Sequence, residues 1–288
     1  MKSLDVGPML GESLSVALRH WALCLLTVFV LGVALLTNTV MISRCVLSPG
    51  CLPNILFMTV APNLDEVIWG ANRVANWLIC GFAIYRVLTS EATRQTKPDA
   101  PRPVKRRGFG RCSLYLSSIT AASYATEVVY RFFAPILYSD ESGVFWVALA
   151  LYNAAHVCIW AYLGARFALY IADLACDGRA VSFSASWQKM RGNRRKVFLL
   201  LFVIEVTTYL ARSAVPESGY LSMDLMLIIA DLERFTGMPR GSLVHRLPGT
   251  LEFAAYAGVS NILCAGAFFA VYRKYAAESP EGQAKVFD

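Results

Sequence analysis

The sequence predicts an all-α protein, an integral membrane helical bundle of about six transmembrane helices with interfacial amphipathic helices. Of the 288 residues, 56% are hydrophobic and only 16% are charged, whereas about a quarter are charged in ordinary soluble domains. Long apolar runs recur along the chain, and basic residues gather in short segments between them. We therefore expect residues 1–288 to form a single membrane domain.

Six stretches are long and apolar enough to be transmembrane helices, because a hydrocarbon core needs roughly 20 helical residues. They lie near residues 20–42, 66–88, 112–137, 144–172, 197–217 and 250–273. The first stretch is longer than the apolar region of a signal peptide, which has about 7 to 15 residues, and no small-residue cleavage site follows it. We therefore expect it to stay in the mature protein.

The basic residues predict the orientation. Thirteen of the 27 Lys and Arg residues occur in two segments, seven in residues 94–111 and six in residues 179–196. Both segments fall on the same side of the membrane when the six spans alternate in direction. Lys and Arg are enriched in cytoplasmic connections, so both termini are expected in the cytoplasm.

Two connections have a clear expected character. Residues 89–111 contain three prolines and many basic residues, which predicts a flexible basic cytoplasmic loop that meets anionic lipid headgroups. A phosphate or nucleic-acid ligand is the sharper alternative for this loop. Residues 221–235 place Asp224 and Asp231 toward one helical side and Leu225 and Leu232 toward another, so we expect an outer interfacial helix.

Residues 182–196, which we name the elbow, join two spans at the expected cytoplasmic face. Ser182, Ser184 or Ser186 can cap a helix there, and Gly192–Asn193 can break it before the next span begins. The residues expected to face lipid headgroups are Trp187, Lys189, Arg191, Arg194, Arg195 and Lys196.

The segment around the elbow carries a family resemblance. Residues 165–202 read "ARFALYIADLACDGRAVSFSASWQKMRGNRRKVFLLLF". The pattern is carried by Arg166, Asp177, Gly178, Arg179, Ser182, Trp187, Gly192 and Asn193. It resembles a segment of poorly characterised bacterial multi-pass membrane proteins and is similar to the membrane domain of some glycerophosphodiester phosphodiesterases. The family's usual Pro after the first Arg is absent. The resemblance covers about 40 residues and implies a bacterial inner-membrane fold without naming an activity.

Ionisable residues within a bilayer either hold helices together or mark a path for a substrate or ion. The intramembrane polar residues expected here are Arg73, Glu127, Arg131, His156, Arg166 and Glu205. At ~1.5 Å per residue, Arg166 and Glu205 lie at similar depths in helices joined by the elbow, so we expect an ion pair between them. Glu127 can pair with Arg73 at a similar depth or with Arg131 one turn along its own helix.

The cysteines and histidines give no metal or cofactor motif. No C-x-x-C pair occurs, and the three histidines are expected at different depths, so we expect no metal and no cofactor. A Cys inside a span usually acts as a small apolar residue. Cys45 and Cys51 lie on the expected outer side with a Pro-Gly turn between them and are the candidate disulfide.

Catalytic motifs of the P-loop, zinc-hydrolase and serine-hydrolase types are absent from the sequence. The leading interpretation is a non-catalytic inner-membrane protein that binds membrane lipids or another membrane protein and assists an envelope process. Nucleic acid is not an expected partner. The alternative is a small permease or an ion- or proton-coupled transporter that uses the intramembrane charges. An enzyme acting on lipids would use Asp173 and Asp177, whose spacing also fits an ordinary helix end.

Overall fold

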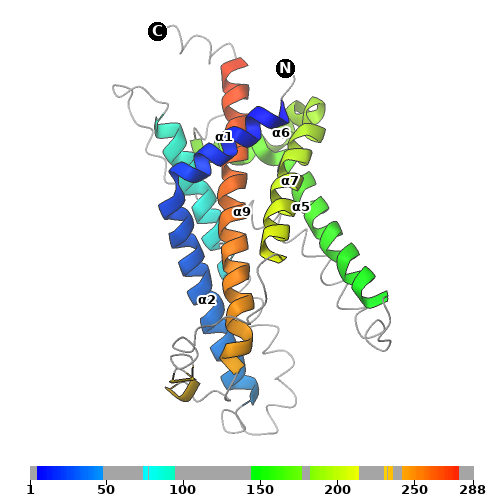
Figure 1. The fold of residues 1–288 in the computed structure, drawn as a ribbon. Helices are drawn as coiled ribbons and strands as arrows, with labels where there is room; N and C mark the ends of the chain where they lie inside the picture. Colours follow the sequence, from blue (N-terminus) through cyan, green and yellow to red (C-terminus); the bar gives the residue numbers. More distant parts are fainter. Residues whose placement is uncertain are drawn as a thin grey trace. The chain divides into compact units, whose positions relative to one another are not determined.

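A computed structural model describes residues 5–47, 74–76, 78–94, 144–176, 182–213, 230–231, 233–235 and 242–278. In these residues the chain is almost entirely helical and contains no strand (Figure 1). The all-α class expected from the sequence is therefore confirmed for the described part of the chain.

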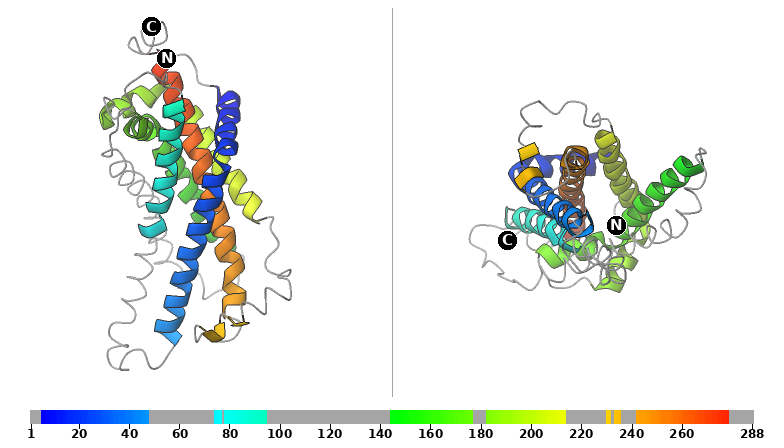
Figure 2. Two further views of the ribbon diagram at one scale, coloured as in Figure 1. Left: turned by 90° about the vertical axis from the view of Figure 1, so that its left-hand side faces the viewer. Right: turned by 90° about the horizontal axis from the view of Figure 1, so that it is seen from below.

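The main helices cover described long apolar runs of the sequence and also some shorter, more polar segments. They are α1 (Val6–Arg19), α2 (Trp21–Leu47), α5 (Val144–Cys176), α6 (Phe183–Lys189), the 3-10 turn η1 (Met190–Gly192), α7 (Arg194–Ser213) and α9 (Ser242–Glu278). Residues 74–76, 78–94, 230–231 and 233–235 are also helical. α9 is one continuous helix, drawn orange to red in Figures 1 and 2.

Two described helices are long and apolar enough to cross a membrane, Ala154–Ala175 within α5 and Thr250–Tyr275 within α9. The pair formed by α1 and residues 21–37, which bends at the junction, is a third candidate if the two helices form one span. α7 falls short because it begins with three basic residues and also carries Glu205. The expected span at residues 112–137 lies outside the described residues, and the one at residues 66–88 is described only in part.

The chain divides into two compact units. The first comprises Met1–Trp21, Gly81–Thr207 and Ser260–Asp288, and the second comprises Ala22–Cys80 and Thr208–Val259. The residues that carry the expected elbow and most of the described buried charges belong to the first unit. Each unit has its own close helix contact with α9.

In the first unit, α1 packs closely against α9. A Cβ placed on Gly266 of α9 would lie 2.8 Å from both the Cα and the carbonyl oxygen of Ser13, so only glycine permits this approach. The Ser13 hydroxyl donates to the carbonyl of Leu263. Glu12 of α1 also forms an ion pair with Arg273 at 2.8 Å. No helix was expected at residues 6–19.

In the second unit, the core lies between α2 and the N-terminal half of α9. Leu31, Ala254 and Ala257 are buried together. A Cβ on Gly258 would lie 2.5 Å from a methyl carbon of Val28, so the two helices approach closely at this point as well. Small residues on one face let helix backbones approach and gain dispersion contacts, as is known for membrane helix pairs.

Candidate functional site

The elbow has the capped and broken helix that the sequence predicts. The Ser182 side chain accepts a hydrogen bond from the Ala185 N–H at 3.2 Å and so caps α6. α6 continues into the 3-10 turn, which ends at Gly192, and α7 begins at Arg194 after Asn193. The Ser182 cap therefore sets the beginning of this short helix, and the 3-10 turn follows its end.

The basic residues of the elbow lie at its surface. Lys189, Arg191 and Arg195 are exposed, whereas Arg194 and Lys196 are half-buried. The Lys189 ammonium contacts the hydroxyl of Tyr275, and the Lys196 ammonium lies 3.9 Å from Asp5. Among the described residues, no carboxylate lies within ion-pair distance of the three elbow arginines.

Aromatic side chains hold α6 against α5. The Phe167 ring stacks on the Phe183 ring with centroids 4.3 Å apart and lies 5.6 Å from the Trp187 ring. Tyr162 and Tyr170 of α5 contact the rings of Trp187 and Phe183 edge-on. Such aromatic pairs contribute about 0.5–1.5 kcal/mol each beyond the area they bury, so the aromatic contacts fix the position of the elbow on α5.

Arg166 lies within this aromatic contact. Its residue exposure is 4%, and its guanidinium carbon lies 4.1 Å from the Trp187 ring centroid and 5.4 Å from that of Tyr162. One terminal nitrogen donates to the Trp187 carbonyl at 3.4 Å, and the other donates to the Tyr162 hydroxyl at 3.3 Å. The Nε atom has no hydrogen-bond partner among the described residues. The contacts of this charge within the described part of the chain are thus with neutral groups.

Ser186 ties the elbow to the backbone of α5. Its buried hydroxyl donates to the Arg166 carbonyl at 3.1 Å and accepts from the Tyr170 N–H at 3.3 Å. These two backbone groups are four residues apart and are the ones that an α-helix joins directly. The hydroxyl therefore inserts beside the backbone of α5 at the level of Arg166.

The expected ion pair between Arg166 and Glu205 was wrong. Glu205, which is 8% exposed, accepts a hydrogen bond from the Ser260 hydroxyl of α9 at 2.6 Å, and the Cys264 sulfur lies 3.9 Å from the same oxygen. Arg166 instead contacts Trp187. The prediction matched depth along two helices, but depth does not fix the direction of a side chain around the helix axis. Arg166 turns toward α6, and Glu205 turns toward α9.

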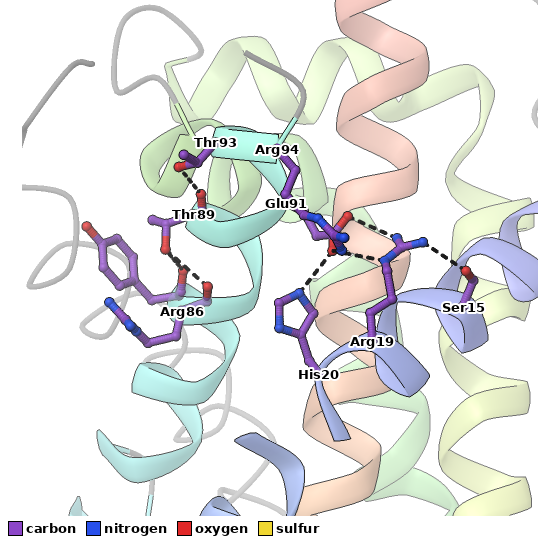
Figure 3. Close-up of polar contacts among 9 residues, drawn as sticks. Ser15, Arg19, His20, Arg86, Thr89, Glu91, Thr93 and Arg94 are labelled. Carbon is purple, nitrogen blue, oxygen red and sulfur yellow. Dashed lines mark hydrogen bonds and ion pairs between the residues drawn. The ribbon is translucent and has the colours of Figure 1, made fainter. Parts of the chain in front are cut away.

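A second charged cluster was missed in the sequence. Its centre is Glu91, 4% exposed, on the helix of residues 78–94 (Figure 3). Arg19 donates to both carboxylate oxygens of Glu91, from Nε at 3.2 Å and from a terminal nitrogen at 2.9 Å. The His20 Nε2 atom lies 2.9 Å from the carboxylate and the Arg94 guanidinium 3.6 Å. We call these four residues the Glu91 cluster.

Electrostatics in and near the Glu91 cluster shift two carboxyl groups in opposite directions. Burial raises the pKa of Glu91, but hydrogen bonds from Arg19 and His20 outweigh burial and leave this pKa below its ordinary value. Burial raises the pKa of Glu12, and the nearby Arg273 and Arg19 only partly offset it. Since a carboxylate only accepts hydrogen bonds, ionised Glu91 requires the His20 Nε2 to donate.

The remaining sequence-predicted residues are only partly described. Arg73, Glu127, Arg131 and Cys51 lie outside the described residues, so the candidate disulfide between Cys51 and Cys45 of α2 stays a prediction. The half-buried ring of His156 lies 6.3 Å from the Tyr152 ring on the same helix. Three of the described cysteines, Cys24, Cys158 and Cys264, are free thiols. Within the described parts of the chain, no three His, Cys, Asp or Glu side chains are grouped to hold a metal ion.

No protein family, curated protein or solved structure matches the chain. The family resemblance of residues 165–202 stays a prediction. Function is therefore inferred from the residues of the elbow and of the charged groups around it.

Proposed function

We propose that this chain is a non-catalytic, multi-pass protein of the bacterial inner membrane, with both termini in the cytoplasm, and that its elbow binds anionic lipid headgroups. The observation that carries the proposal is the set of three arginines, Arg191, Arg194 and Arg195, that have no carboxylate partner among the described residues. Trp187, which is 37% exposed beside them, is a residue type enriched at membrane interfaces.

The position of these arginines suits a lipid surface. They precede or begin α7, whose following residues are apolar and enter the expected fifth span. A basic residue near an anionic membrane surface contributes about 1 kcal/mol of attraction. Three such residues at one helix end therefore favour anionic over zwitterionic lipid by at least about tenfold, since about 1.4 kcal/mol corresponds to a factor of ten.

The test is native mass spectrometry of the full chain extracted in mild detergent and supplied with equal phosphatidylglycerol and phosphatidylcholine. The wild-type protein is expected to retain phosphatidylglycerol preferentially. The R191Q/R194Q/R195Q variant is expected to lose at least about tenfold of this preference.

A charge-matched control is available in the expected outer connection. The R234Q/R240Q/R246Q variant removes the same charge and should keep the wild-type lipid preference. Equal loss in both variants would reduce the effect to net charge and contradict a site at the elbow. An unchanged lipid preference in the elbow variant, with loss of a co-purifying membrane protein, would favour the protein partner instead.

A further inference from the structure

Arg166 is a buried cation whose hydrogen-bonding capacity is largely unused. A guanidinium has five N–H donors, and in Arg166 one terminal nitrogen donates to the Trp187 carbonyl and the other to the Tyr162 hydroxyl, at 3.4 and 3.3 Å. Its Nε atom has no hydrogen-bond partner in the parts of the chain that the structure describes. No described carboxylate forms an ion pair with it.

This arrangement leaves an energetic deficit. A buried charge ordinarily has an oppositely charged partner, because desolvation without one costs several kcal/mol. Stacking on Trp187 at 4.1 Å supplies a cation–π contact to one face of the guanidinium. The ring face does not accept hydrogen bonds from the N–H groups, which lie in the plane of the guanidinium. The unused donors therefore call for an anionic acceptor with more than one oxygen atom.

We propose that Arg166 is the anchor of a binding site for a phosphate group. Phosphate presents several anionic oxygens, and the planar guanidinium fork matches it bidentately. The inference rests on the proposed function, because the elbow would bring phosphate-bearing headgroups to this place, and it adds the residue and the chemical group that are recognised.

The surroundings of Arg166 suit a ligand that arrives from the protein surface. Tyr162 and Trp187, the two aromatic residues over the guanidinium, are 40% and 37% exposed. Both aromatic side chains that contact the buried guanidinium are therefore accessible from the protein surface. The exposed cations Lys189 and Arg191 lie within four residues of Trp187 and raise the local concentration of anions.

The experiment measures which lipids the full chain retains in native mass spectrometry, with three probes of equal acyl chain length. Phosphatidylglycerol is anionic and carries phosphate, phosphatidylcholine is zwitterionic and carries phosphate, and monogalactosyl diacylglycerol carries none. The wild-type protein should retain both phospholipids over the galactolipid. R166Q should lose this phosphate preference by about tenfold or more, the effect of removing a charge-assisted hydrogen-bonded pair. R166K keeps the positive charge but lacks the planar guanidinium, so it should lose part of the phosphate preference.

A second measurement needs no variant and so does not depend on the folding of R166Q. Short-chain phosphatidylcholine should raise the melting temperature of the wild-type protein more than a galactolipid of the same chain length, because a ligand bound only to the native state stabilises it. Equal effects of the two lipids, or a wild-type phosphate preference in R166Q, would overturn the proposal. Either result would leave Arg166 with a purely structural role on the aromatic rings.

The outcomes separate this inference from the proposed function. The elbow variant R191Q/R194Q/R195Q should lower the preference for phosphatidylglycerol over phosphatidylcholine and leave that for phosphatidylcholine over the galactolipid. R166Q should lower the preference for phosphatidylcholine over the galactolipid and leave that for phosphatidylglycerol over phosphatidylcholine. Competition by millimolar inorganic phosphate would identify free phosphate as a ligand of Arg166, and its absence would identify the lipid headgroup as the source.

Discussion

The Glu91 cluster and the surroundings of Arg166 place a buried charge in opposite situations. Glu91 is a carboxylate with the guanidinium groups of Arg19 and Arg94 and the His20 ring within 3.6 Å of it, and Arg19 alone engages both of its oxygens. Arg166 is a cation with two long hydrogen bonds to neutral oxygens and no described acid. Both residues are 4% exposed.

The difference separates a structural role from a binding role. The acceptor capacity of Glu91 is engaged by groups of α1 and of its own helix, so the cluster links residues far apart in the chain and has little capacity for a ligand. Arg166 has unused N–H donors, and the rings of Trp187 and Tyr162 orient its guanidinium. A charge that the protein itself satisfies holds helices together, whereas one that it leaves unsatisfied is a candidate binding group.

The largest expected effect comes from breaking the satisfied charge. E91Q leaves Arg19 facing a neutral amide, and we expect it to lower the free energy of unfolding by about 3 kcal/mol, the low end for a broken buried pair, because Arg19 is partly exposed. Unfolding by increasing sodium dodecyl sulfate in mixed micelles measures this change.

R94Q is the matched control for E91Q. The Arg94 side chain is 59% exposed and lies 3.6 Å from the carboxylate, so its loss should cost less than about 0.5 kcal/mol. Equal effects of E91Q and R94Q would show that the buried contact with Arg19 contributes no more than the exposed Arg94 pair, and would remove the distinction drawn between the two regions.

The next effect tests whether helix packing or charge holds α1 in place. G266A puts a methyl group 2.8 Å from the Ser13 backbone, which cannot move aside as a side chain can. We expect a loss of about 2 kcal/mol in the same assay, as for other overpacked contacts.

The control for G266A is G11A in α1, where a Cβ meets nothing within 4 Å. It should stabilise the helix by about 0.5–1 kcal/mol, because Gly has a low helix propensity. A G266A variant as stable as wild type would mean that polar and charged contacts, and not close helix packing, fix α1.

The elbow could be predicted from the sequence because its signals are local. Ser182 caps α6 and Asn193 precedes α7 within a few residues of where the chain turns. The long apolar runs likewise predicted α2, α5 and α9, because a run of apolar residues long enough to cross a membrane favours one continuous helix. The described residues do not test the full set of six spans.

The charged contacts could not be predicted, because they depend on how separate helices turn toward one another. Glu91 meets Arg19 and His20 across about 70 residues of chain. The sequence signal for this cluster was weak. Glu91 follows the expected span at residues 66–88, and Arg19 and His20 lie at the start of the one at residues 20–42. The wrong pairing of Arg166 with Glu205 has the same origin.

A smaller effect is expected at the unsatisfied charge when no ligand is bound. R166M removes the cation–π contact with Trp187 but also removes the cost of burying a lone charge, so the lipid-free protein should change in stability by no more than about 1 kcal/mol. W187F keeps an aromatic face and should change less. A loss as large as that of E91Q would mean that the protein itself satisfies Arg166.

The smallest effect is the pH dependence of stability, in which Glu91 and Glu12 act with opposite signs on either side of their ordinary pKa of 4.5. Glu91 has a lowered pKa when folded, so its contribution is present above pH 4.5 and is lost as the pH falls through the lowered value. Glu12 has a raised pKa when folded, so its contribution is lost as the pH rises from 4.5 through the raised value.

Melting temperatures of the wild type, E91Q and E12Q between pH 3 and 7 separate the two carboxyl groups. The fall in melting temperature below pH 4.5 should be smaller in E91Q than in the wild type. The fall in melting temperature above pH 4.5 should be smaller in E12Q. The change in stability that each carboxyl group causes across this pH range should be smaller than the loss of stability in E91Q at neutral pH. Only the net pKa shift contributes to the pH dependence, and for Glu91 burial offsets part of the effect of the hydrogen bonds. An acid-side loss that is the same in E91Q as in the wild type would show that Glu91 is not held ionised by Arg19 and His20.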